Sequence, residues 1–236
     1  MDKDNSKTKN IKKAFVDTIP VMTGYIVLGI GFGIVLETKG YGVGWAFASS
    51  LLVYAGSLQF VMINLLTGGA SLITTALTAL MVNARHLFYG ISMIDRYKGA
   101  GKKKPYMIFA LTDETYSLVC QDPVSEDMSE KHRYYFLVSL FDQCYWVTGS
   151  VIGSVLGAII PFNTEGIDFA LTALFVTVFV EQWLSTKKHA PALVGVGSSV
   201  VCLLIFGSES FLIPAMALIT TALTFMRKSG KEGLSE

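Results

Sequence analysis

Charged residues are scarce in this 236-residue sequence, where Asp, Glu, Lys and Arg together make up 16% of the residues. Typical soluble domains contain about 25%. The 45 residues from Gly40 to Ala84 contain no charged residue and no histidine. Hydrophobic residues make up 52%, and the mean hydropathy is +0.51. This composition argues against a soluble domain and predicts a protein that crosses a lipid bilayer several times.

Features of most enzyme and nucleic-acid-binding classes are also missing. Cys120, Cys144 and Cys202 lie far apart, without the spacing of a disulfide framework or a zinc site. The net charge is +1 and no basic, aromatic-rich patch occurs, so nucleic acid is not an expected partner. The sequence has no P-loop, HExxH or Ser-His-Asp arrangement. We therefore predict no enzyme activity, no catalytic residues, no cofactor and no metal site.

Polarity divides the chain into five parts. Residues 1–17 form a tail with five lysines, which the positive-inside rule places in the cytoplasm. No small-residue cleavage site follows the first apolar run, so that run is expected to be a retained helix rather than a signal peptide. The other parts are a first transmembrane half (18–94), a connecting region with a basic loop, a short acid-containing segment and an acidic loop (95–133), a second transmembrane half (134–226), and a polar C-terminal tail (227–236). This pattern predicts a multi-pass protein of the cytoplasmic (inner) membrane.

The expected fold class is all-α: a polytopic membrane bundle with broken or re-entrant helices and a three-plus-three internal repeat. The apolar segments are 18–36, 41–66, 70–94, 106–120, 134–160, 169–184, 190–206 and 211–226. The repeat is suggested by Tyr25-x3-Gly29-x3-Gly33, which recurs as Tyr145-x3-Gly149-x3-Gly153. If segment 106–120 crosses the membrane, the second half is inverted relative to the first; otherwise the halves are parallel. The acidic loop favours the inverted arrangement, whereas Lys187 and Lys188 oppose it.

Glycines at every fourth position let two helix backbones approach closely. We therefore assign a helix-packing role, rather than a ligand-binding one, to five glycines: Gly29, Gly33, Gly149, Gly153 and Gly157.

The third apolar segment is interrupted by Asn83-Ala84-Arg85-His86. An arginine within the hydrocarbon region costs roughly 2.5 to 3.5 kcal/mol, so such a residue tends to be functional. A cytoplasmic N-terminus and a cytoplasmic basic loop require an even number of crossings between them. This count is met if the third segment is re-entrant and turns back near Asn83 to His86. The alternative is that Arg85 extends to the cytoplasmic interface.

Other polar residues in apolar surroundings complete the candidate site. The substrate-binding candidates are Arg85, His86, Asn83, Gln59, Ser57 and Gly56. The candidates for proton coupling or ammonium binding are Asp113, Glu114, Asp142 and Glu181. Asp142 and Glu181 stand near segment ends, which favours an interfacial position. For Asp113 and Glu114 a solvated, interfacial role is an equal alternative.

Several of these motifs resemble the AzlC-type branched-chain amino acid permeases. The most specific are Tyr54-Ala55-Gly56-Ser57-Leu58-Gln59-Phe60 and Asn83-Ala84-Arg85-His86-Leu87-Phe88-Tyr89-Gly90. The resemblance implies an exporter of Leu, Ile, Val and analogues such as azaleucine. It also implies a small AzlD-type membrane protein as partner, and it supplies no established set of binding residues. The alternative is a channel-like or non-transporting membrane subunit of a larger complex.

Overall fold

The computed structural model describes residues 2–120, 128–160, 176, 179–180, 183–184, 189–207 and 211–232. The chain forms two compact units, Met1–Ala170 and Leu171–Glu236, and each is described by itself. All regular secondary structure in these residues is helical, which confirms the predicted all-α class. The first unit contains α1 (Asp2–Thr38), α2 (Val43–Leu52), α3 (Gly56–Thr67), α4 (Leu72–Val82), α5 (Ala84–Met93), the 3-10 turn η1 (Gly101–Lys103), α6 (Lys104–Phe109), α7 (Asp113–Val119) and α8 (Met128–Ile159).

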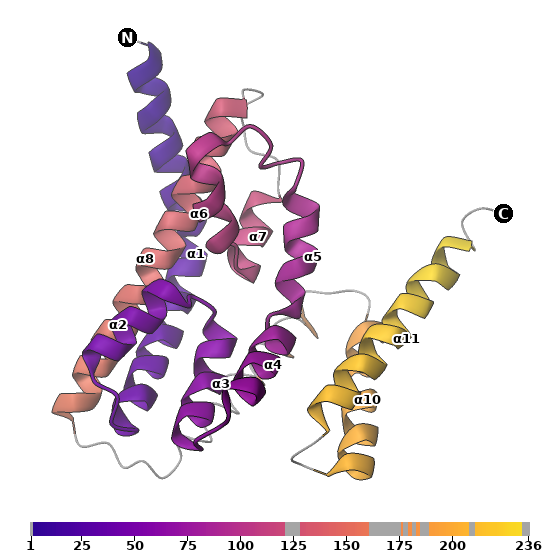
Figure 1. The fold of residues 1–236 in the computed structure, drawn as a ribbon. Coiled ribbons are helices and arrows are strands. Elements are labelled where there is room, and N and C mark those ends of the chain that lie inside the picture. Colours follow the sequence, from indigo (N-terminus) through magenta and orange to yellow (C-terminus); the bar gives the residue numbers. More distant parts are fainter. Residues whose placement is uncertain are drawn as a thin grey trace. The chain divides into compact units, whose positions relative to one another are not determined.

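Helices α1 and α8 lie side by side, pack along most of their length and form the most extensive helix–helix contact of the first unit (Figure 1). The Tyr134 hydroxyl donates to Asp17 Oδ2 at 2.6 Å near their beginnings, and Gly29 meets Gly149 further on. Residues further along α1 therefore contact residues further along α8, so the two helices run in the same direction. The inverted arrangement, favoured from the loop charges, is wrong for this pair, because inversion would make the two helices antiparallel.

Helices α2 and α3 form a hairpin within the second apolar segment, which the sequence had suggested to be one piece. Gln59 Nε2 on α3 donates to the hydroxyls of Ser49 and Ser50 on α2, at 3.4 and 3.2 Å. These partners lie at similar distances on either side of Tyr54, where the backbone adopts φ 43°. Left-handed backbone is disfavoured for a residue other than glycine and ends a helix, so the chain turns back at Tyr54.

Helices α6 and α7 form a second hairpin in the fourth apolar segment. The Tyr106 hydroxyl of α6 donates to Gln143 Oε1 at 2.7 Å, and the Thr115 hydroxyl of α7 donates to Asp142 Oδ2 at 2.7 Å. Both arms therefore meet adjacent residues of α8, with the turn between them. Thr112 caps α7, since its hydroxyl accepts a hydrogen bond from the Thr115 amide at 3.3 Å.

The third apolar segment divides at Asn83, where α4 ends and α5 begins. In Figure 1, α5 continues onward from α4 and does not fold back beside it. The turns that interrupt apolar segments of the first unit therefore lie in the second and fourth segments, and not near Asn83 to His86 as expected.

One end of the first unit gathers the beginnings of α1 and α8 and the basic loop. Ala14, Tyr97, Ala100 and Tyr134 belong to one buried apolar cluster there, and His132 lies 3.0 Å from the Arg96 carbonyl oxygen. The lysine-rich start of α1 and the loop from Lys98 to Lys104 consequently lie at the same end.

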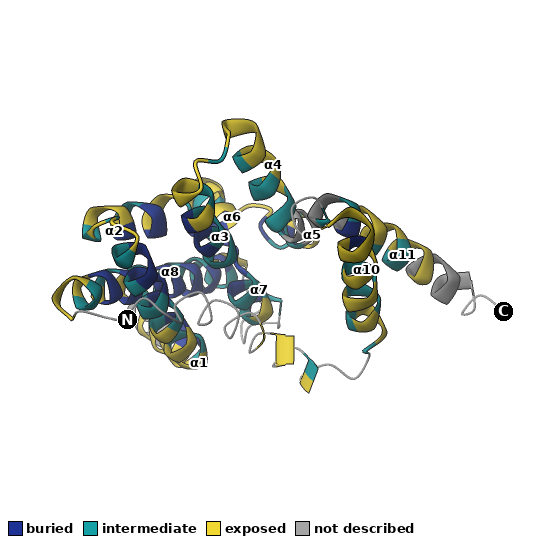
Figure 2. Ribbon diagram, turned by 90° about the horizontal axis from the view of Figure 1, so that it is seen from below, coloured by how far each residue is buried: buried dark blue, intermediate teal, exposed yellow. Residues whose placement is uncertain are grey.

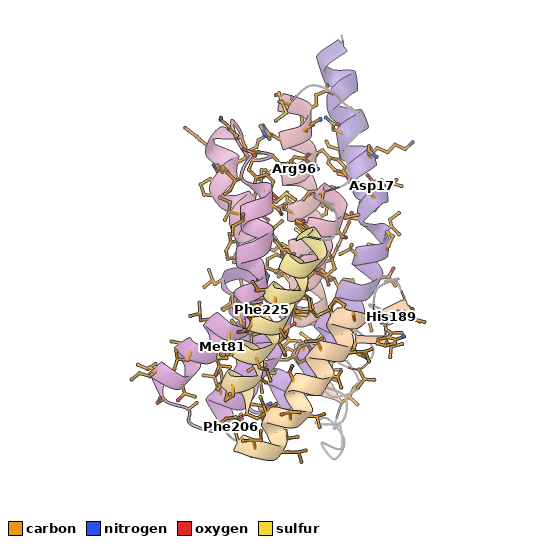
Figure 3. The ribbon with its side chains drawn as sticks, turned by 90° about the vertical axis from the view of Figure 1, so that its right-hand side faces the viewer. Asp17, Met81, Arg96, His189, Phe206 and Phe225 are labelled. Carbon is orange, nitrogen blue, oxygen red and sulfur yellow. The ribbon has the colours of Figure 1, made fainter. Side chains whose placement is uncertain are left out.

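The second unit contains α10 (Ala190–Phe206) and α11 (Leu212–Glu232), which pack against each other. Most of the residues whose burial is described are exposed, as Figure 2 shows, although they are largely apolar. His189, which precedes α10, stacks on Trp183 with ring centroids 4.1 Å apart (His189 is labelled in Figure 3). Exposed apolar helices of this kind are typical of segments that face lipid or another helix.

By length and composition, one described helical stretch, Asn10–Thr38, suffices to cross a membrane. Five shorter apolar helical stretches of 10 to 17 residues accompany it in the described chain.

Candidate functional site

The turns of the two hairpins meet beside the middle of α8. The Tyr54 ring, at the first turn, lies 6.3 Å from the Phe109 ring at the end of α6. Gln143 of α8 connects both hairpins, because its Nε2 donates to the Leu51 carbonyl oxygen at 3.1 Å while its Oε1 accepts from Tyr106. Segments that are distant in the sequence are thereby held at one level of α8.

Gln59 is fully buried in this region, and both its Oε1 and its Nε2 are hydrogen-bonded. Its Oε1 accepts a 2.9 Å hydrogen bond from Trp146 Nε1 of α8, while its Nε2 donates within the hairpin. Gly56 lies against the same indole, and a Cβ at this glycine would come 3.1 Å from the ring. Gln59 and Gly56 are thus placed to fix the hairpin to α8, which is a structural role.

Two carboxyl groups, Glu114 of α7 and Asp142 of α8, lie at the same level. The Tyr25 hydroxyl of α1 donates to Glu114 Oε2 at 2.6 Å. The Asp142 side chain is fully buried, and its Oδ2 accepts the hydrogen bond from Thr115. Asp142 therefore lies in the interior, although its place in the sequence suggested the interface.

Glu114 and Asp142 lie far from the ends of the two long helices, α1 and α8. Tyr25 lies near the middle of the stretch Asn10–Thr38, and Asp142 near the middle of α8. Among the described residues, no lysine or arginine forms an ion pair with Glu114 or Asp142. Glu114 is half-buried and Asp142 is fully buried. A buried carboxylate without a cation is costly, so Asp142 remains a candidate for proton or ammonium binding.

The residues around Arg85 occupy a different part of the first unit. Arg85 lies in the first turn of α5, and its side chain is outside the described part of the structure. His86 Nδ1 lies 3.3 Å from the Asn83 carbonyl oxygen. Tyr89 of α5 stacks on Tyr116 of α7 with ring centroids 4.7 Å apart, so α5 contacts the helix that carries Glu114.

The remaining candidates fall into three groups. Asp113 is half-buried in the first turn of α7, and Ser57 is half-buried in the first turn of α3. Glu181 lies outside the described residues. The glycines lie between α1 and α8: a Cβ at Gly29 would come 2.9 Å from the Ser150 nitrogen, one at Gly149 2.8 Å from the Ile26 oxygen, and one at Gly157 3.0 Å from Glu37 Cβ.

Sequence reasoning missed the hydroxyl groups that surround the two acids. Tyr25, Thr112 and Thr115 come from α1 and α7, and Tyr54 stands at the hairpin turn. Thr112 had a detectable signal, since threonine directly before Asp113-Glu114 is typical of a helix N-cap. No local pattern marks Tyr25, whose position depends on a partner 89 residues away.

Comparison with known proteins identifies the family. The family model described as AzlC protein matches residues 20–160. The chain belongs to the AzlC family. It is 43% identical to the branched-chain amino acid transport protein AzlC of Bacillus subtilis (strain 168), over 97% of this chain and 89% of that protein. No solved structure matches.

Other AzlC relatives come from distant bacteria. An uncharacterized membrane protein of Helicobacter pylori (strain ATCC 700392 / 26695) is 42% identical over 93% of this chain and 96% of its own length. The inner membrane protein YgaZ of Escherichia coli (strain K12) is 27% identical over 71% of both chains. These relatives are membrane proteins, in agreement with the scarcity of charge in this sequence.

Proposed function

We propose that this AzlC-family chain is a secondary transporter that exports branched-chain amino acids across the cytoplasmic membrane, together with a small AzlD-type membrane partner. The observation that carries the proposal is a pair of acids beside the two hairpin turns, the half-buried Glu114 and the fully buried Asp142, near the middle of the stretch Asn10–Thr38 and of α8. Transporters of several folds bind their substrates near the bilayer midplane at interrupted helices. The identity to a relative named for branched-chain amino acid transport supports the substrate class.

The arrangement of the first unit supports a specific topology. In this proposal α1, the pair α4–α5, and α8 cross the membrane, while the α2/α3 and α6/α7 hairpins enter from opposite sides. Backbone turns at membrane depth are tolerated where they are buried in protein, as the Tyr54 turn is against Phe109. The lysine-rich start of α1 and the basic loop lie at one end, which is the cytoplasmic end by the positive-inside rule.

The substrate is a zwitterion with an aliphatic side chain, so it needs a cation, an oxygen-rich site and an apolar surface. Arg85 is the proposed partner of the substrate carboxylate, and Asp113 or Glu114 that of its ammonium group. An aliphatic pocket discriminates by only about 1 to 3 kcal/mol per methylene. The transporter should therefore accept Leu, Ile and Val together.

The function is tested by amino acid export from cells that express this chain with and without its AzlD-type partner. Cells are loaded with dipeptides of Leu, Ile or Val, and with dipeptides of Asp or Lys as controls. We expect faster export of the three aliphatic residues alone, and only when both proteins are present. Equal export of all five amino acids, or none, would contradict the proposal.

A channel is distinguished from a transporter in proteoliposomes. A transporter shows saturable leucine flux, and unlabelled leucine on the far side accelerates uptake of labelled leucine by counterflow. A channel or a non-transporting subunit shows neither. Counterflow is expected here, because the turns are packed against Tyr25, Trp146 and α8 rather than arranged around an open pore.

The topology predicts that the loops before α6 and before α8 face the same side of the membrane. Single cysteines are introduced at Lys103 and Ser129 in a variant that lacks the three native cysteines. We expect both to resist a membrane-impermeant thiol reagent in whole cells and both to react in inverted vesicles. Labelling of position 129 from outside would show that α6 and α7 cross the membrane and would reject the proposed arrangement.

A further inference from the structure

A continuous chain of hydroxyl groups connects the half-buried Glu114 to the fully buried Asp142. Glu114 Oε2 lies 2.6 Å from the Tyr25 hydroxyl, which lies 2.6 Å from Thr112 Oγ1. Thr112 Oγ1 lies 3.1 Å from Thr115 Oγ1, which lies 2.7 Å from Asp142 Oδ2. The chain therefore contains four oxygen–oxygen links between two carboxyl groups, and three hydroxyls supply them.

When both acids are ionised, the three hydroxyl protons are too few to form four hydrogen bonds. Each hydroxyl has one proton to donate, and an ionised carboxylate has none. If Tyr25 donates to Glu114, Thr112 to Thr115 and Thr115 to Asp142, the 2.6 Å link between Tyr25 and Thr112 has no proton. Two buried oxygens cannot remain that close without one. A single added proton, on either carboxyl group, fills all four links.

We propose that Glu114 and Asp142 share one proton through Tyr25, Thr112 and Thr115, and that this pair is the proton-coupling site of the transporter. Only the coupling role rests on the proposed transport function; the shared proton does not depend on it. It assigns Glu114 to the proton, which leaves Asp113 as the acid for the substrate ammonium group. One titratable proton per site implies that one proton is exchanged for each amino acid exported.

The second oxygen of Asp142 is independent support for a bound proton. Asp142 Oδ1 is fully buried, and no described residue donates a hydrogen bond to it. An unpaired buried oxygen costs more when it belongs to an ionised group than to a neutral one. A proton on Oδ2 that donates to Thr115 turns Oδ1 into the carbonyl oxygen of a neutral acid, and this lowers the cost.

Among the residues whose side chains the structure describes, none that faces the pair carries a positive charge. Tyr54 at the hairpin turn interacts with both acids, Tyr106 of α6 lies near Asp142, and Asp113 is the neighbour of Glu114 on α7. Cys144 lies two residues after Asp142 on α8, near Tyr106. All these groups are neutral or acidic, so the proposal assigns the compensating charge to a proton.

Transfer along the chain leaves every hydroxyl unchanged. When Glu114 gives its proton to Tyr25, Tyr25 passes its own to Thr112, Thr112 to Thr115, and Thr115 to Asp142. Four O–H bonds break and four form, and the net result is one proton moved from one carboxyl group to the other. The reverse sequence returns it. No charged hydroxyl persists, since all steps shift together along links of 2.6 to 3.1 Å.

The shared proton is tested by infrared spectroscopy of the purified protein at neutral pH. A protonated carboxyl group has a carbonyl stretch above the amide band, and this stretch shifts in D2O. We expect one such band in the wild type and complete loss of it in both Glu114→Gln and Asp142→Asn. In either variant the new amide N–H donates into the hydroxyl chain, fills all four links, and leaves the remaining acid ionised. Absence of the band in the wild type, or survival of a band in either variant, would overturn the proposal.

A matched control is available between α1 and α8. Asp17 of α1 also accepts a 2.6 Å hydrogen bond from a tyrosine, Tyr134, but it forms an ion pair with Lys13 at 3.0 Å. Asp17→Asn should therefore leave the infrared band unchanged. Circular dichroism and gel filtration identify folded variants, and if Glu114→Gln does not fold, Asp142→Asn alone decides the outcome.

Transport in proteoliposomes tests the coupling separately from the proposed function. Wild-type protein should show leucine counterflow and uphill leucine movement driven by a pH gradient. Asp142→Asn should lose the pH-driven movement, whereas the control Asp17→Asn should retain both counterflow and the pH-driven movement within about twofold. Counterflow without any pH-driven movement in the wild type would reject the coupling role while the transporter assignment stands. No counterflow in the wild type would reject the function and leave the infrared result to judge the shared proton.

Discussion

Gly33→Leu is expected to prevent stable packing of α1 against α8. A Cβ at this position would come 2.5 Å from the Ser154 nitrogen and 2.9 Å from the Gly153 carbonyl carbon. These are backbone atoms of a facing helix, which cannot move aside as a flexible side chain can. Overpacking in a well-packed interior costs typically 1 to 3 kcal/mol and occasionally more. We expect about 3 kcal/mol or more here, and hence little folded protein in the membrane fraction.

Gly31→Leu is the matched control for this prediction. Gly31 lies two residues away on the same helix, and a Cβ there has no neighbouring atom within 4 Å. Both variants exchange glycine for the same apolar residue, so changes in hydropathy and helix propensity are equal. Size-exclusion chromatography after detergent extraction should give wild-type yield for Gly31→Leu and aggregate or no protein for Gly33→Leu. Equal yields of the two variants would show that the close contact of α1 and α8 does not hold the first unit together.

The glycine pattern shows how far local sequence predicts this fold. Glycines spaced four residues apart predict a helix face without side chains. Gly29 and Gly33 lie on one such face, and Gly149 and Gly153 on another. The repeat predicts nothing about which faces meet. In the structure the two similar motifs pack directly on each other in parallel, whereas the loop charges had favoured an inverted arrangement. Composition predicted the all-α class and the membrane location, because these depend on every residue and not on pairings.

The hairpin turns were not predictable from local signals. Tyr54 adopts φ 43°, a backbone conformation that glycine or asparagine usually takes, so the residue at this turn gives no signal of it. The interruption at Asn83 was visible as a polar run, although α5 continues from α4 there. Asp142 was assigned to the interface from its distance to a loop. Its burial depends on Thr115, which the α6/α7 hairpin brings to it.

Arg85→Ala is expected to abolish leucine export while the protein still inserts in the membrane. Arg85 is a cation within an apolar stretch, in the first turn of α5, where unpaired N–H groups also favour an anion. In this proposal its partner is the substrate carboxylate. Hydrogen bonds to charged groups contribute about 1.5 to 3 kcal/mol, which corresponds to roughly a 10- to 150-fold loss in affinity. Export is measured as the rate of intracellular leucine decrease after dipeptide loading.

Two further variants separate a substrate-binding role from a general effect of charge. Arg133→Ala removes an arginine at the beginning of α8, at the end proposed to be cytoplasmic, and should leave the export rate within about twofold of the wild type. Arg85→Lys retains the charge but not the two-pronged geometry of the guanidinium group, so it should raise the KM more than it lowers the maximal rate. Wild-type export by Arg85→Ala would remove this residue from substrate binding.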